Sequence, residues 1–330
     1  MPIALIGPEP IRRKPGTYVE ILEAAGFSLV YPEGDRTFDL AQLRRLLPEA
    51  DAMMAGGERV PGEVIGLAPK LRVIARTGVG YDAIDLEGAT ARGVAVTITP
   101  GTNHEAVAEQ AFGLILAVSR RLAYYDRLIR AGVWERDLVT PVRGKTLGLV
   151  GMGRIGRAMV PRALAFGMNV IAFDPIHDPE FDVKHGLQRV LFEEVLAASD
   201  VLSLHLPATP ETRGLIHAGT IAKMKPGAIL INTSRGSLVV EADLVAALDS
   251  GHLAGAGLDV FDPEPPLPAN PLPQHPHVVS SPHVAGIDVK SMDDMATLAA
   301  QCMVDVYEGR WPTACLVNPE VAGTGGPRSA

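Results

Sequence analysis

Three polar residues in the second half of the chain have the side chains of an acid, a base and an anion binder. Arg235 and His283 each follow a short apolar run, and Glu264 lies in a loop that holds seven prolines between residues 262 and 276. An apolar run that ends in a polar loop is typical of a strand in a doubly wound sheet, where ligands bind at the carboxyl ends of the strands. These three side chains are therefore candidates for chemistry.

A carboxylate, an imidazole and a guanidinium together could transfer a proton beside a bound anion. A carboxylate bonded to one imidazole nitrogen favours the imidazolium, so the other nitrogen can protonate a carbonyl oxygen while hydride reaches the carbon. A guanidinium can bind a substrate carboxylate through two hydrogen bonds. Taken singly, each residue also fits a plainer role: Arg235 in a surface ion pair, Glu264 as a solvated loop charge, and His283 as a satisfied loop histidine.

A glycine motif follows the apolar run at residues 147–150 and precedes a helical pattern. Gly151 permits a tight turn, Gly153 lets the backbone approach a pyrophosphate, and Gly156 lets the helix lie close to the sheet. The helix N-terminus offers free N–H groups to the anion. An ordinary glycine turn is the alternative, but the order of strand, turn and helix favours a dinucleotide site.

An acidic residue stands at the expected distance from this motif. Asp174 lies 23 residues after Gly151, at the end of the next apolar run. Its carboxylate would accept hydrogen bonds from the adenosine ribose and repel a 2′-phosphate. The next two residues, Pro175 and Ile176, offer no arginine to offset that repulsion. We therefore expect NAD rather than NADP as the cofactor.

Short apolar runs alternate with helical patterns along most of the chain, which predicts an α/β fold with two doubly wound parallel sheets. A single long helix is predicted from Asn103 to Ala131, because no proline interrupts it and Gly132 follows. The predicted strands lie at 3–6, 28–31, 52–54, 73–75 and 94–97 before that helix, and at 146–150, 170–173, 201–204, 229–232 and 255–260 after it.

Six motifs resemble, in order, the signature series of the D-isomer-specific 2-hydroxyacid dehydrogenases. They are Arg76 to Asp82, Thr99 to Asn103, Val107 to Glu109, Asn232 to Gly236, Gly257 to Phe261 with Glu264 and Pro265, and Ser281 to Gly286. The resemblance implies that His283 is the acid/base, Glu264 its partner, and Arg235 the cation that orients the substrate. It also implies further contacts: for the substrate, Arg76, Val79 and Gly80; for the cofactor, Arg154, Ile155, Leu206, Ser234 and Asp259, the last with the nicotinamide carboxamide.

The same resemblance implies how the chain is divided. Residues 1–99 and 288–330 would form a flavodoxin-like substrate domain, into which a Rossmann cofactor domain of residues 100–287 is inserted. The length of 330 residues is consistent with two domains. The family is typically homodimeric through the cofactor domain, and Tyr124 and Tyr125 on the long helix are candidates for that contact, with core packing as their alternative.

Composition and charge restrict the classes of binding partner and the cellular compartment that we expect for the protein. The net charge of −8, without a basic stripe, disfavours nucleic acid, and no apolar run approaches the length that spans a membrane. The first residues do not resemble a secretory signal. Cys302 and Cys315 form neither a disulfide framework nor a metal motif. We expect a cytoplasmic protein without a metal.

The substrate is the open question. The segment Trp134 to Arg136 resembles phosphoglycerate dehydrogenases, yet Met54 to Gly56 has no arginine where those enzymes usually carry one, and we expect no regulatory domain after Pro319. A small 2-keto acid such as hydroxypyruvate or glyoxylate is favoured, with D-3-phosphoglycerate as the alternative. An NAD(H)-sensing binding protein on the same fold, like the C-terminal-binding-protein corepressors, is the alternative from another class, although the expected basic surface or long tail is missing.

Overall fold

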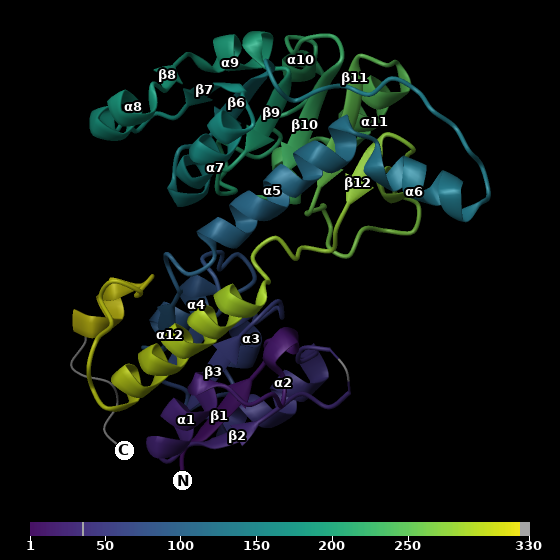
Figure 1. The fold of residues 1–330 in the computed structure, drawn as a ribbon. Helices are drawn as coiled ribbons and strands as arrows, with labels where there is room; N and C mark the ends of the chain where they lie inside the picture. Colours follow the sequence, from purple (N-terminus) through teal and green to yellow (C-terminus); the bar gives the residue numbers. More distant parts are fainter. Residues whose placement is uncertain (35, 324–330) are drawn as a thin grey trace. The chain divides into compact units, whose positions relative to one another are not determined.

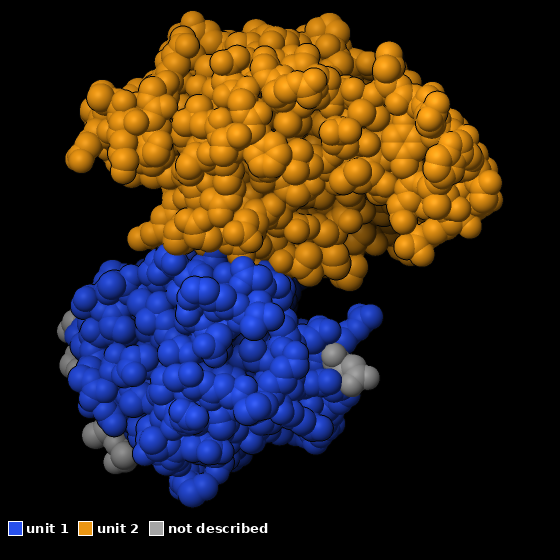
Figure 2. Space-filling model, in the orientation of Figure 1, with its two compact units in different colours: residues 1–103, 287–330 blue, residues 104–286 orange. Residues whose placement is uncertain are grey.

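The computed structural model describes residues 1–34 and 36–323, and the chain folds into two compact units (Figure 1 and Figure 2). Unit 1 combines residues 1–103 with residues 287–330, and unit 2 is the continuous segment 104–286. The expected domain boundaries, after residues 99 and 287, lie close to these divisions. Both units are built on parallel sheets with helices on both faces, so the predicted α/β class is confirmed.

Unit 1 contains a five-stranded parallel sheet in the order β2-β1-β3-β4-β5. This order is typical of flavodoxin-like folds, in which the ligand crevice lies at the carboxyl ends of β1 and β3. Apart from the half-buried edge strand β2, the strands are short runs that are mostly buried on both faces. They are β1 Ile3–Ile6, β2 Ser28–Val30, β3 Ala52–Ala55, β4 Val73–Arg76 and β5 Ala95–Thr97.

Helices cover both faces of this sheet. Alternate residues of one strand serve opposite faces: Ile6 packs in the core beneath α1 and α12, whereas Leu5 packs in the core beneath α2, α3 and α4. The α-helices are α1 Thr17–Ala24, α2 Leu40–Leu46, α3 Gly62–Ile65, α4 Leu86–Ala91 and α12 Val289–Tyr307, and the 3-10 helices are η1 Glu9–Ile11, η2 Leu47–Glu49 and η5 Pro319–Gly323.

The C-terminal part of the chain is an integral part of unit 1. The long helix α12 buries its methionines and alanines against the sheet beside α1. Beyond it, the fully buried Asn318 accepts a hydrogen bond from Val96 N–H at 2.8 Å and donates to the Val94 carbonyl and to Thr90 Oγ1, both at 2.9 Å. One amide therefore connects the end of the chain to β5 and α4.

Unit 2 contains a seven-stranded parallel sheet in the order β12-β11-β10-β9-β6-β7-β8. From β6 the chain first builds outward through β7 and β8, then crosses to β9 on the other side, so the ligand crevice is expected where β6 and β9 adjoin. The strands are β6 Thr146–Val150, β7 Asn169–Phe173, β8 Gln188–Arg189, β9 Val201–Leu204, β10 Ala228–Asn232, β11 Leu253–Leu258 and β12 Val278–Ser280.

Helices α5 and α7 cover one face of the second sheet, and α9, α10 and α11 cover the other (Figure 1). Two glycines in β11 let α5 approach closely: a Cβ on Gly255 would lie 2.7 Å from Val118, and one on Gly257 would lie 2.8 Å from Leu114. The helices are α5 His104–Ser119, α6 Leu122–Arg130, α7 Arg154–Ala165, α8 Pro179–His185, α9 Phe192–Ala198, α10 Ala218–Ile221 and α11 Glu241–Asp249, with 3-10 turns η3 Gly236–Leu238 and η4 Leu272–Gln274.

The prediction of one long helix from Asn103 to Ala131 is wrong. The helix α5 ends at Ser119, and α6 starts at Leu122 after Arg121, whose φ of 54° lies in the left-handed region. The Arg121 guanidinium lies 4.0 Å from the centre of the Tyr124 ring and donates to Asp137 at 3.2 Å. These contacts stabilise a break that neither glycine nor proline marks in the sequence. In residues 1–34 and 36–323, no helix is long and apolar enough to cross a membrane.

The bonds of Asn318 lead to a prediction about stability. Replacing Asn318→Ala leaves a buried N–H and a buried carbonyl of the β5 segment unpaired, so we expect the free energy of unfolding of unit 1 to fall by about 2 kcal/mol or more. Denaturant unfolding followed by circular dichroism measures this. The exposed Glu320→Gln, two residues further on, is the control and should change the midpoint little. Equal midpoints for both variants would contradict the role given to Asn318.

Candidate functional site

The turn between β6 and α7 has the backbone geometry of a phosphate-binding site. Gly151 has a φ of 99°, and a Cβ there would overlap the His205 carbonyl at the end of β9. A Cβ on Gly156 would overlap the Gly151 carbonyl, so the helix packs directly on the turn. Gly153, by contrast, has open space around its Cα and caps α7 without a side-chain hydrogen bond.

This turn fits the pyrophosphate of a dinucleotide. The first N–H groups of α7 point out of a helix end that no side chain caps, and the helix dipole favours an anion there. Arg154 is exposed at the first helical position and Ile155 is half-buried beside it. Leu206 approaches the turn from the loop after β9, with its Cδ2 3.0 Å from the position of a Cβ on Gly151. The residues predicted around the cofactor phosphates are thus neighbours.

Asp174 is held rigidly just beyond β7. Its Oδ2 accepts a hydrogen bond from Met152 N–H at 2.6 Å, and its Oδ1 accepts one from Ile176 N–H at 2.7 Å. Each carboxylate oxygen keeps a second lone pair that could accept from a ribose hydroxyl. The carboxylate therefore stands beside the phosphate turn in a fixed orientation.

A cation that the sequence reasoning missed bonds to the same residue, Met152, as this carboxylate. Arg157 in α7 donates from Nε to the Met152 carbonyl at 3.1 Å and pairs through Nη1 with Asp178 at 2.6 Å. The sequence prediction considered only the residues that directly follow Asp174 in the chain. The helical position of Arg157, one turn into α7, is the signal that could have indicated it.

The two residues proposed from the sequence as an acid/base pair, His283 and Glu264, contact one another in unit 2. His283 Nδ1 lies 2.7 Å from Glu264 Oε2, and the other oxygen of Glu264 accepts from Phe261 N–H at 3.1 Å. Both side chains are partly exposed. The backbone of His283 has a φ of 55°, a left-handed conformation that is uncommon outside glycine and is concentrated at functional sites.

The Glu264 carboxyl is tuned to remain ionised. Burial alone would raise its pKa, but the hydrogen bond and charge of His283, the N–H of Phe261 and the charge of Arg235 together lower the pKa below its ordinary value. An ionised carboxylate that accepts from Nδ1–H stabilises the protonated imidazole and leaves Nε2 for a substrate. The pair therefore has the geometry to donate and accept a proton at Nε2.

Asp259 fixes the loop that carries His283. It is completely buried and accepts hydrogen bonds from Ser281 Oγ at 2.5 Å, Val284 N–H at 3.0 Å and Ala285 N–H at 2.8 Å. The N–H of His283 also donates to the Asp259 carbonyl, at 2.8 Å. The contact with a nicotinamide carboxamide implied for Asp259 stays a prediction; the observed bonds give it a positioning role.

The Arg235 loop packs against the loop that leads to Glu264. A Cβ on Gly236 would overlap the Phe261 backbone, so the two loops touch main chain to main chain. Asn232 stabilises the turn because its Nδ2 donates to the Arg235 carbonyl at 2.8 Å and its Oδ1 accepts from Ser234 N–H at 3.0 Å. The Ser234 hydroxyl donates to the Leu204 carbonyl at 2.7 Å.

His205, beside the phosphate turn, does not share this chemistry. Burial lowers its pKa to about 4, so the imidazole is neutral at physiological pH. Its Nε2 lies 3.0 Å from the Ser203 hydroxyl, and its Nδ1 is a buried atom without a hydrogen-bond partner among the described residues. We assign it a structural role at the end of β9.

The predicted substrate contacts of unit 1 follow β4. Arg76 is the last residue of that strand, Val79 is exposed, and Gly80 is half-buried. Gly78 between them has a φ of 128°, and its N–H donates to Thr99 Oγ1 at 2.7 Å. The loop is therefore anchored while its following N–H groups stay near the surface.

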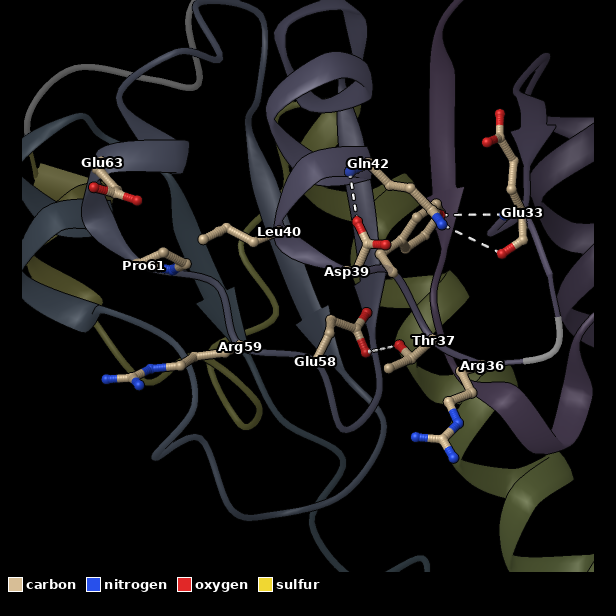
Figure 3. Close-up of a pocket in the computed structure, with 11 residues that line it drawn as sticks. Glu33, Arg36, Thr37, Asp39, Leu40, Gln42, Glu58, Arg59, Pro61 and Glu63 are labelled. Carbon is tan, nitrogen blue, oxygen red and sulfur yellow. Dashed lines mark hydrogen bonds between the residues drawn. The ribbon is translucent and has the colours of Figure 1, made fainter. Parts of the chain in front are cut away.

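Glu58, which the sequence analysis did not single out, is a buried carboxyl near the ends of β1 and β3. Its Oε2 accepts from Gly56 N–H at 2.8 Å and from the Thr37 hydroxyl at 2.5 Å, and burial raises its pKa. Figure 3 shows this carboxylate and the hydroxyl pointing toward one another, where both line a surface hollow of 660 Å³. None of the predicted site residues lines that hollow.

The part of the chain that the structure describes shows no metal site. No group of three or more histidine, cysteine, aspartate or glutamate side chains there could hold a metal ion.

Comparison with known proteins identifies the family. The model of the NAD-binding domain of D-isomer-specific 2-hydroxyacid dehydrogenases matches residues 112–285, which include the phosphate turn and the His283–Glu264 pair. The chain belongs to this family. The Rossmann-like unit 2 is thus an NAD-binding domain, in agreement with the cofactor expected from Asp174.

Relatives of this chain include enzymes named D-3-phosphoglycerate dehydrogenase and glyoxylate reductase. A D-3-phosphoglycerate dehydrogenase of Mycobacterium leprae is 42% identical over 293 residues, which cover 86% of this chain and 55% of that protein. A glyoxylate reductase of Korarchaeum cryptofilum is 43% identical over 268 residues, 79% of this chain and 80% of that protein. The crystal structure of the TT0316 protein from Thermus thermophilus has a TM-score of 0.85 at 40% identity and covers 96% of this chain and 99% of its own. This chain therefore spans about half the length of the mycobacterial relative.

Proposed function

We propose that this protein is an NAD-dependent dehydrogenase that interconverts a small 2-keto acid and the D-2-hydroxy acid. The observation that carries the proposal is the 2.7 Å contact between His283 Nδ1 and an ionised Glu264, on loops beyond adjacent strands β12 and β11 of the NAD-binding domain. Relatives named glyoxylate reductase and D-3-phosphoglycerate dehydrogenase support the reaction class.

The proton step follows from the orientation of the imidazole. Glu264 accepts the Nδ1–H and stabilises the protonated ring, so Nε2–H can donate to the carbonyl oxygen of a 2-keto acid during reduction. In the opposite direction Nε2 accepts the hydroxyl proton. When bound, the nicotinamide cofactor supplies or accepts the hydride at C2. Asp259 keeps the loop in place while His283 changes its charge.

The substrate carboxylate needs donors and a cation. In unit 2 we assign the cation to Arg235, whose planar fork matches a carboxylate. The substrate contacts that the family resemblance implies in unit 1, Arg76 at the end of β4 with the backbone at Val79 and Gly80, stay a prediction.

The cofactor contacts of the proposal follow the phosphate turn. The N–H groups at Gly153, Arg154 and Ile155 would bind the pyrophosphate, and Asp174 would accept hydrogen bonds from the adenosine ribose. Leu206, Ser234 and Asp259 would contact the rest of the cofactor. A 2′-phosphate would be repelled by Asp174, so NAD is the preferred cofactor.

A panel of 2-keto acids tests the function. With NADH we expect turnover of glyoxylate or hydroxypyruvate above that of 3-phosphohydroxypyruvate, and with NADPH much less turnover. His283→Ala should lower turnover by about 100-fold or more while the Kd for NADH, measured by fluorescence, stays within about twofold.

Each unexpected result of these experiments contradicts a different part of the proposal. No turnover of any 2-keto acid, with NADH still bound, would favour a cofactor-sensing binding protein. Preferred use of 3-phosphohydroxypyruvate would favour a phosphoglycerate dehydrogenase, and equal use of both cofactors would contradict the role of Asp174. Loss of NADH binding in His283→Ala, with chemistry intact at saturation, would contradict the acid/base assignment.

The pH profile tests the Glu264 partner. Because the pKa of its carboxyl is held below the ordinary value, Glu264 is ionised throughout the range from about pH 6 to 9 and favours the protonated imidazole needed for reduction. Glu264→Gln removes this charge, so the alkaline fall of the reduction rate should move to lower pH by about one unit. Glu241→Gln, which removes a charge that bonds the same loop at Asp262 N–H, is the control. A profile that moves equally in both variants would argue against the pair.

We further propose a homodimer through the surface formed by α6 and the segment that follows it. This surface exposes Leu122, Ile129, Val133, Trp134 and Leu138, and none of the residues of α6 is buried. Contiguous exposed apolar side chains are typical of protein interfaces.

The protein would act in the cytoplasm, which suits its two free buried cysteines.

Light scattering tests the dimer. The wild-type protein should have twice the chain mass, and Leu138→Asp with Trp134→Asp should give the chain mass because two carboxylates would be desolvated at the interface. Val289→Asp, at another highly exposed apolar residue in unit 1, is the control and should stay dimeric. A monomeric wild-type protein, or a double variant of unchanged mass, would contradict this interface.

A further inference from the structure

Two side chains of opposite charge form hydrogen bonds with the backbone of Met152 in the phosphate turn. Asp174 accepts its N–H at 2.6 Å, and Arg157 donates to its carbonyl at 3.1 Å. Because both side chains bond to the same residue, Arg157 Nε and the Asp174 carboxylate lie within about 10 Å of one another. An arginine therefore lies within reach of the region of the carboxylate that is proposed to select the adenosine ribose.

The charged partner of this arginine is Asp178. The Asp178 carboxylate contacts Arg157 Nη1 at 2.6 Å and caps α8 by accepting from Phe181 N–H at 3.2 Å. The Phe181 N–H and the charge of Arg157 hold the pKa of Asp178 below its ordinary value, so the pair is charged at neutral pH. The centre of the Phe181 ring lies 5.4 Å from the guanidinium. Arg157 is thus engaged on three sides by Met152, Asp178 and Phe181.

We propose that Asp178 is a specificity-determining residue for the adenosine end of the cofactor, because it withholds Arg157 from a 2′-phosphate. Guanidinium groups bind phosphate through paired hydrogen bonds, and a free arginine at this position would offset the repulsion from Asp174. Asp178 satisfies the guanidinium instead. The preference for NAD therefore depends on two carboxylates, Asp174 by repulsion and Asp178 by sequestering the neighbouring cation. The inference rests on the proposed cofactor contacts of Asp174, not on the reaction.

Cofactor binding to Asp178→Asn tests this role without any turnover. Asparagine keeps an oxygen that can cap α8 at Phe181 N–H but loses the charge that holds Arg157. The probes are NADH and NADPH, titrated by nicotinamide fluorescence, and adenosine 2′,5′-bisphosphate against AMP, titrated by calorimetry. We expect the Kd for both 2′-phosphorylated probes to fall about tenfold, while the Kd for NADH and AMP changes by less than about twofold.

Two further variants assign the gain to Arg157. Glu180→Gln removes an exposed charge from the same helix and should leave the ratio of NADPH to NADH affinity unchanged. Arg157→Met added to Asp178→Asn should abolish the gain. If Asp178→Asn shifts the ratio no more than Glu180→Gln, or if the gain survives Arg157→Met, the proposal is wrong.

If Asp178→Asn does not fold, a different single variant still tests the proposal. Arg157→Met alone should weaken NADH and NADPH by the same factor, since the guanidinium supports the turn but is not available to a 2′-phosphate. A selective loss of NADPH affinity in this variant would overturn the proposal. If the reaction proposed above fails, the affinities still report on Asp178, because no 2-keto acid is present.

Discussion

The site in unit 2 depends on main-chain contacts between loops at the carboxyl edge of one parallel sheet. Gly151 and Gly156 let the phosphate turn touch the end of β9 and the start of α7, and Gly236 lets the Arg235 turn touch the backbone near Glu264. A Cβ at any of these three positions would overlap neighbouring backbone atoms, so only glycine lets the main chains approach this closely. The phosphate turn, the Arg235 turn and the loops of Glu264 and His283 are therefore parts of a single edge of the sheet.

Buried polar side chains then fix what the glycines bring together. A buried carboxylate without donors is very unfavourable, so Asp259 can exist in the interior only because Ser281, Val284 and Ala285 supply three hydrogen bonds. Since these donors flank His283, the same bonds hold its backbone in a left-handed conformation. The uncharged amide of Asn232 fixes the Arg235 turn in a similar way, through hydrogen bonds to the backbone.

Structural features that neighbouring residues determine could be predicted from the sequence. Features that depend on tertiary contacts between residues far apart in the chain could not. The glycine turn, Asp174 and the strands that precede Arg235 and His283 follow from short-range patterns, and the resemblance supplied the partnership of Glu264 with His283. The break at Arg121 has no glycine or proline to mark it, since its left-handed turn is stabilised by Tyr124 and Asp137. The Arg157–Asp178 pair joins residues 21 positions apart and requires the packing of α7 beside β7.

The closure of unit 1 by residues from the end of the chain sets an order for biosynthesis. Helix α12 covers one face of the first sheet, and Asn318 bonds to β5, so both arrive only after the whole of unit 2 has been synthesised. Unit 2 is continuous and can complete its core first. Until α12 is synthesised, the part of the sheet face that packs against it, including Met54 and Val73, lacks its cover, so the N-terminal segment cannot complete its core early in translation.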